Sequence, residues 1–194
     1  MEEDRLKWNL RFGSEEAFLG VRPSPFLARE MERIKALAPG RRALDIACGE
    51  GRNAIFLARH GFEVTGLDIS DVGLAKADRW ATEAGVTVDF RWADLEDYCI
   101  DEEYDLIINF NFLLRDLIPQ AFAALAPGGL LIVDTILESP ETSGTHTAEY
   151  LLRYGELGKM FQALPGEVLF QEEVREVAEG EMPTARVLFR KRES

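Results

Sequence analysis

The chain has 194 residues, of which 46% are hydrophobic, and it carries a formal net charge of −13. This length and hydrophobic content are those of a globular protein with one sizeable core, and they argue against disorder. A negative charge of this size repels the phosphates of nucleic acids and anionic lipids. We therefore expect neither nucleic acid nor a membrane as a partner.

Three further features predict a cytoplasmic protein. The two cysteines, Cys48 and Cys99, do not form the pattern of a disulfide framework, so reduced thiols are the simpler interpretation. The first residues, MEEDRLKW, lack the basic and then apolar order of a signal peptide. The longest apolar stretch, GGLLIVDTIL, is too short and too charged to span a bilayer.

The first forty residues have helical character. The clearest predicted helix runs over Pro25–Leu37. The earlier piece, Leu6–Val21, carries Trp8, Phe12 and Phe18 among charged residues. Packing against the core is the simpler role for these aromatic side chains, and a lid across the strand ends is the alternative.

From residue 42 onward, strand patterns alternate with helix patterns. The predicted strands are Arg42–Ala47, Glu63–Asp68, Val86–Trp92, Tyr104–Asn109 and Leu130–Thr135. The predicted helices between them are Asn53–Arg59, Asp71–Ala84 and Pro119–Ala126. This alternation implies a parallel sheet with right-handed crossovers and with helices on both faces.

The end of the chain departs from this alternation. After a loop from Glu138 to Tyr150 and a helix around Glu156–Leu164, strand-like runs follow at Glu167–Val177 and Ala185–Arg192. The short connection AEGEMP between these runs requires antiparallel pairing. We predict a single α/β domain over residues 1–194, in which a helical lid segment (1–40) precedes a core (41–194) with a Rossmann-like, mostly parallel seven-stranded sheet that ends in an antiparallel hairpin.

Polar residues and glycines follow the predicted strands. In an open parallel sheet, ligands bind beyond the carboxyl ends of the strands, where Asp45, Gly49, Gly51, Asp68 and Asp94 all fall. Glycines let the backbone approach a ligand without a Cβ clash. A carboxylate at the tip of the second strand can accept two hydrogen bonds from a ribose diol. The pattern therefore predicts a nucleoside site.

The charges around the glycine turn favour one kind of nucleoside. The turn GEGRNA matches the dinucleotide fingerprint only loosely. Glu50 in the turn and Asp45 before it would repel a pyrophosphate, although Arg52 offsets part of that repulsion. The two carboxylates would suit a positively charged ligand. S-adenosylmethionine has a sulfonium and an ammonium and no phosphate, so the pattern favours it over a nicotinamide cofactor.

The stretch LDIACGEGRNAIFLARHGFEVTGLDIS resembles the first two motifs of class I S-adenosylmethionine-dependent methyltransferases, and Asp45, Gly49 and Gly51 match the first of them. The stretch FRWADLEDY resembles the third-strand motif, in which an aspartate contacts the adenine amino group, and Asp94 matches that aspartate. LAPGGLLIVDT resembles the family's turn into the fifth strand. The resemblance runs from about Arg42 to Arg192 and implies an antiparallel last strand.

A narrower likeness concerns the tellurite-resistance methyltransferase-like group. It rests on GEGRNAIFLARHGFEVTGLDIS, FLLRDLIPQAFAALAPGG and EYLLRYGEL, and on an N-terminal Trp-Asn-x-Arg-Phe that resembles a lid segment around the methionine end of the cofactor. Tellurite as a substrate does not follow from it. The two resemblances and the strand-end positions together imply the cofactor-binding residues Trp8, Arg11, Asp45, Ala47, Gly49, Gly51, Asn53, Asp68, Ile69, Asp94, Leu95 and Asn109.

The segment NFNF, residues 109–112, ends the fourth strand, where the family places residues that face the methyl group. Its Asn-x-x-Phe spacing resembles the Asn-Pro-Pro-Tyr/Phe motif of amino-group methyltransferases, but both prolines are absent, which argues against nucleobase amino groups. Packing is the simpler role for Phe110 and Phe112. The candidate substrate-binding residues are Asn111, Arg115, His146 and Tyr150.

Simpler roles exist for several of these candidates. Asp45 can cap the turn that follows it, and Asp94 can belong to a solvated loop. Asp68 can cap the next helix, although Ser70 and Asp71 are better placed to do so. A single arginine such as Arg115 is by default a surface charge. A histidine in a loop is commonly solvated, and as a general base His146 is the less favoured reading.

The predicted function is methyl transfer from S-adenosylmethionine to a small-molecule acceptor. No catalytic residue is assigned, because the cofactor itself brings the leaving group. No metal site is expected, because no spacing of His, Cys and Asp suggests zinc. Two alternatives stay open: a nicotinamide-dependent oxidoreductase on a similar sheet, and a cofactor-binding protein without catalysis. The acceptor and the oligomeric state do not follow from the sequence.

Overall fold

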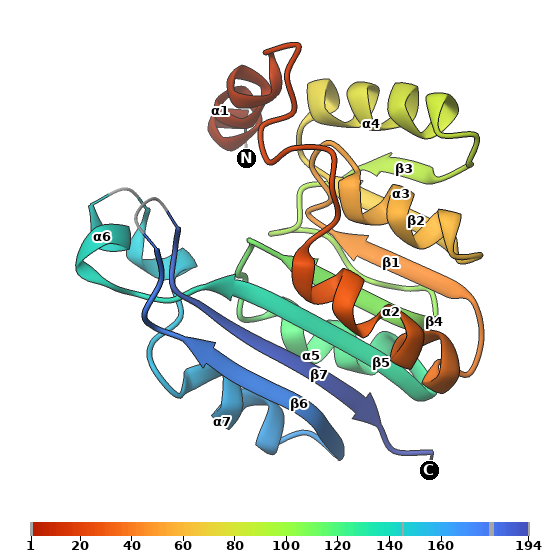
Figure 1. Cartoon of the computed structure of the whole chain (residues 1–194), viewed down its shortest axis with the longest axis vertical. Coiled ribbons are helices and arrows are strands. Elements are labelled where there is room, and N and C mark those ends of the chain that lie inside the picture. Colours follow the sequence, from red (N-terminus) through yellow and green to blue (C-terminus); the bar gives the residue numbers. More distant parts are fainter. Residues whose placement is uncertain (1, 145, 179–180, 194) are drawn as a thin grey trace.

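The computed structural model describes residues 2–144, 146–178 and 181–193 and shows a seven-stranded sheet in the order β3-β2-β1-β4-β5-β7-β6 (Figure 1). Strands β1 to β5 pair in parallel, and β7 pairs antiparallel with both β5 and β6. The predicted fold class is therefore confirmed. The strands are β1 Arg42–Ile46, β2 Glu63–Asp68, β3 Asp89–Trp92, β4 Tyr104–Phe110, β5 Leu125–Ile136, β6 Gly166–Val174 and β7 Thr184–Lys191.

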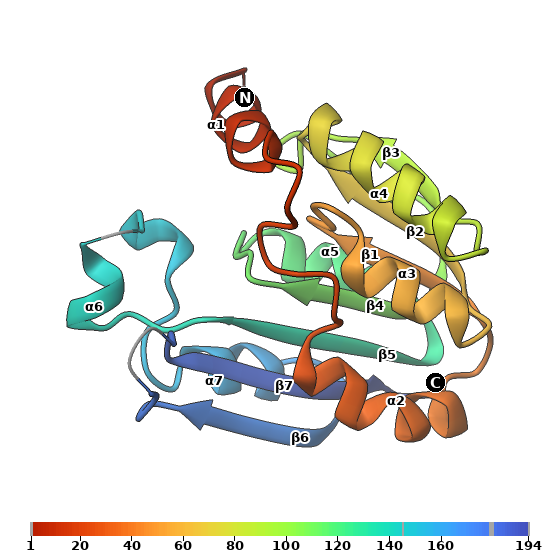
Figure 2. The same cartoon turned by 45° about the horizontal axis from the view of Figure 1, so that its top comes forward.

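Helices cover both faces of this sheet (Figures 1 and 2). One core cluster joins α2, α3 and α4 to the sheet, and the other joins α5 and α7 to the opposite face. The helices are α1 Glu2–Phe12, α2 Pro25–Leu37, α3 Arg52–Arg59, α4 Asp71–Glu83, α5 Leu117–Ala124, α6 Pro140–Ser143, α7 Glu156–Gln162 and the 3-10 turn η1 Ala148–Tyr150. No helix in the described part of the chain combines the length and hydropathy needed to cross a bilayer.

The central strands are buried on both faces, which explains their unbroken apolar runs. In β4, Ile107 packs into the cluster of α5 and α7, and the next residue, Ile108, packs into the cluster of α2 and α3. The same alternation turns the polar residue Asp45 of β1 toward the side of α3. A carboxyl group near the carboxyl end of such a buried strand does not contribute to apolar packing, so it marks a candidate site.

Strand β5 begins earlier than the sequence predicts. It starts at Leu125 and includes Pro127-Gly128-Gly129, which we expected to separate a helix from a strand at Leu130. The pairing with β4 shifts register there, from Tyr104 with Leu125 to Leu106 with Leu130. A Cβ on Gly129 would lie 2.8 Å from the carbonyl oxygen of Ala126. The glycines therefore form an irregularity inside the strand rather than a break before it.

Strand β3 begins later than predicted, at Asp89 instead of Val86. The amide of Val86 donates to the carbonyl of Ala81, and that of Gly85 donates to Thr82, with Gly85 in the left-handed conformation. These two hydrogen bonds form a Schellman stop for α4. Val86 is therefore part of the end of that helix.

The segment predicted as a loop from Glu138 to Tyr150 contains the short helix α6 and the turn η1. Ser139 and Thr142 form a reciprocal capping box at the start of α6. The connection between β6 and β7 includes Glu179 and Gly180, which lie outside the described residues.

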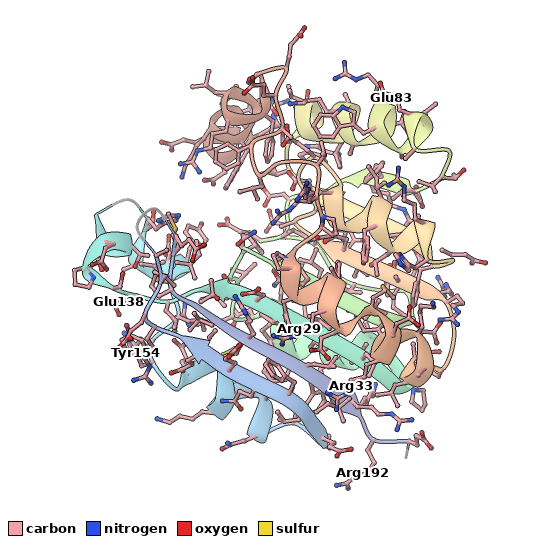
Figure 3. The ribbon with its side chains drawn as sticks, in the orientation of Figure 1. Arg29, Arg33, Glu83, Glu138, Tyr154 and Arg192 are labelled. Atoms are coloured by element: carbon pink, nitrogen blue, oxygen red, sulfur yellow. The ribbon has the colours of Figure 1, made fainter. Side chains whose placement is uncertain are left out.

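Helix α2 lies across the last strands of the sheet, and its residues Arg29 and Arg33 extend over β7 and β6 (Figure 3). The guanidinium of Arg33 donates to the carbonyl of Leu169 at 3.3 Å, and that of Arg29 lies 4.6 Å from the ring centroid of Phe170. These contacts tie the helix to the edge strand β6.

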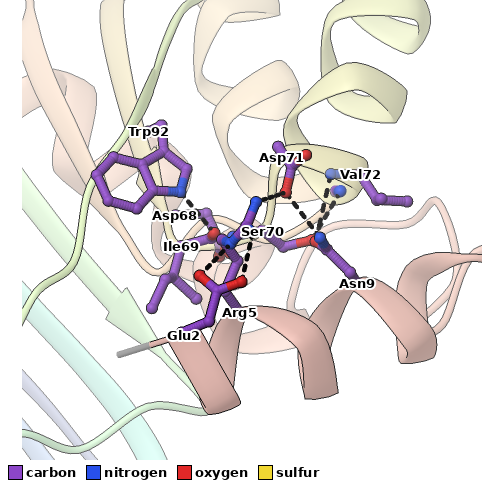
Figure 4. A network of polar contacts seen from close by, with 10 residues as sticks. Glu2, Arg5, Asn9, Asp68, Ile69, Ser70, Asp71, Val72 and Trp92 are labelled. Carbon is purple, nitrogen blue, oxygen red and sulfur yellow. Dashed lines mark hydrogen bonds and ion pairs between the residues drawn. The ribbon is translucent and has the colours of Figure 1, made fainter.

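Helix α1 docks on the first turn of α4 (Figure 4). The Asn9 amide donates to Asp71 at 2.7 Å and accepts from the Ser70 hydroxyl at 2.6 Å. Beyond Phe12 the chain leaves the helix, so the helical stretch is shorter than the expected Leu6–Val21. It then runs without regular structure to the start of α2 at Pro25.

Candidate functional site

A cavity of about 600 Å³ lies at the carboxyl ends of β1, β2 and β4. Its walls come from α1 and the segment after it, from the glycine turn after β1, and from the loops after the next strands. Most of the predicted site residues meet there. Those that line the cavity are Trp8, Arg11, Asp45, Ala47, Gly49, Asn53, Asp68, Ile69, Asp94, Leu95, Asn111, His146 and Tyr150.

Asp45 supplies a buried carboxyl group to this cavity. It is 2% exposed, and its Oδ2 atom has no hydrogen-bond partner within the described residues. Burial first and the neighbouring Asp68 second raise the pKa of Asp45, and Arg52 and a hydrogen bond from the Ala54 backbone lower it; the net result is a pKa of about 8. Asp45 therefore accepts a hydrogen bond from the backbone after the turn and also has a second oxygen, Oδ2, without a partner among the described residues. An unpartnered buried acceptor is suited to a cationic donor.

Asp68 ends β2 and holds the glycine turn against that strand. Its Oδ2 accepts a hydrogen bond from the amide of Gly49 at 2.7 Å, and its Oδ1 accepts one from the amide of Ser70 at 2.9 Å. Burial raises the pKa of Asp68, and these backbone donors oppose the rise. Ser70, not Asp68, caps α4, because its hydroxyl accepts from the amide of Gly73 at 3.0 Å.

The two glycines of the turn do different work. Gly49 lines the cavity at φ +56°, and a Cβ there would lie 3.2 Å from the ring of Phe12. Gly51 does not line the cavity, and a Cβ there would lie 2.8 Å from Ala77 and 2.9 Å from Phe90. Contrary to our expectation, Gly51 therefore does not face the cavity. The absence of a side chain at Gly51 instead lets the start of α3 pack closely against α4 and β3.

Two non-glycine residues adopt the left-handed conformation at the rim of the cavity. They are Ala47 at φ +57°, after β1, and Asn111 at φ +56°, after β4. Such backbone is costly for residues with a Cβ and is concentrated at functional sites. The backbone N–H of Asn111 donates to the backbone carbonyl of Asp134 at 2.8 Å, which fixes the loop after β4 to β5.

Glu50 does not act as the free charge that the sequence suggests. It is 7% exposed, and its Oε1 lies 2.5 Å from the ammonium nitrogen of Lys76, in α4. Its Oε2 accepts from the amide of Phe18 at 2.7 Å. The charge of Glu50 is therefore paired with that of Lys76, a pairing that the sequence does not reveal.

Aromatic side chains from the N-terminal segment form one wall. The rings of Trp8 and Phe12 stack with centroids 5.5 Å apart, and Phe18 meets both rings edge-on. The guanidinium of Arg11 lies 4.8 Å from the Trp8 ring centroid. These residues pack together and also line the cavity. A packing role and a position over the strand ends are therefore compatible.

The opposite wall joins the loop after β4 to the segment around η1. Phe110, Phe112, His146 and Tyr150 all line it. Phe110 is also buried in the core, as the packing role predicts. Burial raises the pKa of Tyr150, and the carboxylates of Asp4 and nearby acidic residues add to the effect.

Arg115 lies outside the cavity walls and is fully engaged elsewhere. Its guanidinium forms two hydrogen bonds with Glu156, at 2.6 and 3.0 Å, and donates to the carbonyls of Glu149 and Leu151. This corrects the expectation that Arg115 meets a substrate anion. Asn109, on β4, is also absent from the walls, although both of its buried amide atoms lack a partner within the described residues.

Arg52 is a residue of the cavity wall that the sequence indicates only as a compensating charge and not as a binding residue. It opens α3, lines the cavity and donates to the carbonyl of Leu19 at 3.1 Å. Burial lowers its pKa, against the nearby charges of Asp45 and Asp134. The feature of the sequence that indicates a site role for Arg52 is its position directly after Gly51, at the start of α3. Met182 and Thr184, before and at the start of β7, also line the cavity, and no local pattern marks them.

These features define a class of protein. An open, mostly parallel sheet carries a glycine turn after β1, a carboxylate at the tip of β2 and a cavity at the strand ends. That arrangement is the one in which α/β proteins bind nucleoside cofactors.

Comparison with known proteins narrows this class. Residues 43–129 match the family model described as a methyltransferase domain. The chain is 33% identical over 112 residues to a ubiquinone biosynthesis O-methyltransferase of Marinobacter nauticus, covering 53% of this chain and 47% of that protein. It therefore spans about half the length of that curated relative.

Two solved structures share the fold. TehB from Haemophilus influenzae has a TM-score of 0.70 at 21% identity, over 85% of this chain and 62% of that one. Magnesium protoporphyrin IX methyltransferase from Synechocystis PCC 6803, with bound SAH, has a TM-score of 0.63 at 16% identity, over 98% and 94%. The resemblance to class I S-adenosylmethionine-dependent methyltransferases, TehB among its structural neighbours, is thus confirmed.

Proposed function

We propose that the chain transfers a methyl group from S-adenosylmethionine to a small-molecule acceptor. The observation that carries the proposal is Asp45, a residue of the cavity wall whose buried Oδ2 lacks a partner within the described residues. The match to a methyltransferase domain supports the reaction type. We treat residues 1–194 as one such domain, with 1–40 as its lid segment, because α1 and the sheet line the same cavity.

The cavity offers a suitable side chain for each polar group of the cofactor. Asp45 would hold the ammonium group, and Arg52 together with Arg11 would hold the carboxylate. Asp68 would accept from the ribose hydroxyls, because each of its oxygens has a lone pair left beyond the backbone donor it already meets. On the adenine side would lie Asp94, with Ile69 and Leu95 as apolar neighbours.

When bound, S-adenosylmethionine supplies an activated methyl group and its own leaving group. The protein then has to orient the two reactants and exclude water. The aromatic walls around Trp8 and Phe110 would exclude water, and the strained loop at Asn111 would fix the acceptor beside β4. A neutral hydroxyl acceptor would need a base, for which His146 is the cavity's candidate.

An oxygen acceptor is the first class to test, because the matched relatives are named as O-methyltransferases. A nucleic acid is not proposed as the acceptor, since a net charge of −13 opposes its binding. We also propose a cytoplasmic location, and the free state of Cys48 and Cys99 supports it.

The test is an acceptor screen with methyl-labelled S-adenosylmethionine over phenols, carboxylic acids, amines and thiols. We expect label in one small-molecule class. Tight binding of the cofactor with no transfer to any class would favour a non-catalytic binding protein. Binding of NADH with no binding of S-adenosylmethionine would favour the oxidoreductase alternative.

A further inference from the structure

Lys76 is a buried cation in the middle of α4. Only 9% of the residue is exposed. Its ammonium nitrogen lies 2.5 Å from Glu50, and it donates to three backbone carbonyls of the N-terminal segment. These are the carbonyls of Phe12 at 3.2 Å, Ser14 at 2.6 Å and Glu16 at 3.1 Å.

A lysine this deep is rare, because removing an ammonium from water is costly unless every donor finds an acceptor. The three N–H groups of Lys76 have four acceptors around them, so the group is satisfied. One of those acceptors, the Phe12 carbonyl, belongs to the last turn of α1, where a helix leaves its carbonyls unpaired and favours a cation. Lys76 therefore caps the end of α1 from another element.

Glu50 completes the arrangement from the glycine turn. One carboxylate oxygen meets Lys76, and the other accepts from the amide of Phe18. Residues 12–18, which we call the strap, are thus held at four backbone groups by one buried ion pair. The pair joins three parts of the molecule: the strap, the first turn of the cofactor cavity and α4.

Apolar burial alone gives the strap and its flanks little attachment. Phe12 is buried between Gly49 and Gly73, where a Cβ on either glycine would lie 3.2 or 2.8 Å from its ring. Trp8 is partly buried and stacks on Phe12, but other large apolar residues nearby are exposed. They are Leu6, Leu10, Phe18, Leu19 and Val21, with 47% to 83% of each residue exposed.

We propose that Glu50 and Lys76 are positioning residues that latch the strap across the cofactor cavity. The strap places Phe12 and Phe18 in the cavity wall and orients the end of α1 that carries Trp8 and Arg11. Because Glu50 belongs to the turn that would meet the cofactor, order in the strap and cofactor binding favour each other. The role in cofactor binding depends on the proposed function, and the ordering of the strap does not.

The experiment compares Lys76→Met, Glu50→Gln and the double variant with the wild type. Arg79→Met is the matched control, because Arg79 is an exposed cation of the same helix that pairs only loosely with Glu83, at 4.0 Å. Amide hydrogen exchange of residues 12–18 reports the strap without any cofactor. Calorimetry with S-adenosylhomocysteine reports the cavity, and thermal unfolding reports the fold.

We expect Lys76→Met to speed exchange in the strap and to weaken S-adenosylhomocysteine by about tenfold or more, while amides of β1 and β4 stay protected. The double variant removes the unpaired buried carboxylate that Lys76→Met leaves, so it should regain thermal stability. It should not regain strap protection or affinity, because the carbonyls still lack their cation. Glu50→Gln should have a smaller effect, and Arg79→Met none.

Wild-type strap exchange in the double variant would overturn the latch. So would affinity that returns together with stability, because the loss would then be one of folding. If Lys76→Met does not fold, the double variant and Glu50→Gln decide in the same way. A wild-type chain that does not bind S-adenosylhomocysteine would contradict the proposed function and the cofactor role, while the exchange data would still decide whether the pair orders the strap.

Discussion

At the scale of single residues, Asp45 and Asp68 show how two identical side chains acquire different roles. Both are buried at the ends of adjacent strands. Asp68 has a backbone donor on each oxygen, and Asp45 has an oxygen with no partner within the described residues. Asp68 therefore shapes the turn, whereas the unpartnered oxygen of Asp45 is the one that we propose meets a charged group of a ligand.

The pH dependence of cofactor affinity should follow Asp45. With a pKa of about 8, this carboxyl is mostly protonated at pH 6 and must lose its proton to pair with an ammonium. Affinity for S-adenosylhomocysteine should therefore rise from pH 6 to pH 8, by up to about tenfold per unit. Calorimetry at pH 6, 7 and 8 measures this rise, which Asp45→Asn should abolish along with much of the affinity. A wild-type affinity independent of pH would contradict the assignment.

The same group should make the protein without added cofactor less stable as pH rises. The pKa of Asp45 is near 8 when folded and near 3.8 when exposed, so between pH 4 and 8 the folded state binds more protons than the unfolded state. Its contribution to stability is thus lost over that window, by up to about 1.4 kcal/mol per unit. Thermal unfolding should show Asp45→Asn gaining on the wild type from pH 5 to pH 8. A constant difference would refute it.

Removing Asp68 should damage both the ligand site and the turn. Asp68→Ala leaves the amide of Gly49 without its acceptor and removes the proposed ribose contact. We expect affinity for S-adenosylhomocysteine to fall by at least about tenfold. Asp89→Ala is the control, because its ion pair with Arg91 is exposed at the start of β3. Near-normal binding by Asp68→Ala would show that the ribose assignment is mistaken.

At the scale of elements, the sequence predicts best where the signals are local. Strand β2 and helix α2 have the predicted bounds, and α4 stops at Gly85 as expected. The start of β5 was missed because the register shift at Pro127-Gly128-Gly129 arises from pairing with β4, which no local pattern records. Helix α6 was missed although its capping signal, Ser139 before Pro140, is present in the sequence.

Arg115 belongs at this scale, because it joins η1 to α7. Arg115→Ala removes two hydrogen bonds to Glu156 and frees the carbonyl of Leu151. We expect a loss of about 1–2 kcal/mol in stability and faster amide exchange over residues 149–156, with cofactor affinity unchanged. Arg192→Ala, at an exposed position that points away from the molecule, is the control (Figure 3). Unchanged stability with impaired acceptor use would return Arg115 to the substrate site.

At the scale of the whole molecule, the cavity is assembled from distant parts of the chain. The N-terminal helix α1 stands on one side of the strand ends, and the segment around α6 and the start of β7 stands on the other (Figure 1). The motifs at the strand ends predict most of the residues that line the cavity at the ends of β1 and β2. They do not reveal Met182 and Thr184, which the antiparallel β7 brings beside β5, or the pairing of Glu50 with Lys76, which depends on how α4 packs.

The central claim is that this cavity receives a cationic nucleoside rather than a diphosphate. Calorimetry of the wild-type chain at pH 8 with S-adenosylmethionine, S-adenosylhomocysteine and NADH measures it directly. Saturable binding of the first two with no heat from NADH is the predicted result. Binding of NADH with no response to either sulfur nucleoside would contradict the account.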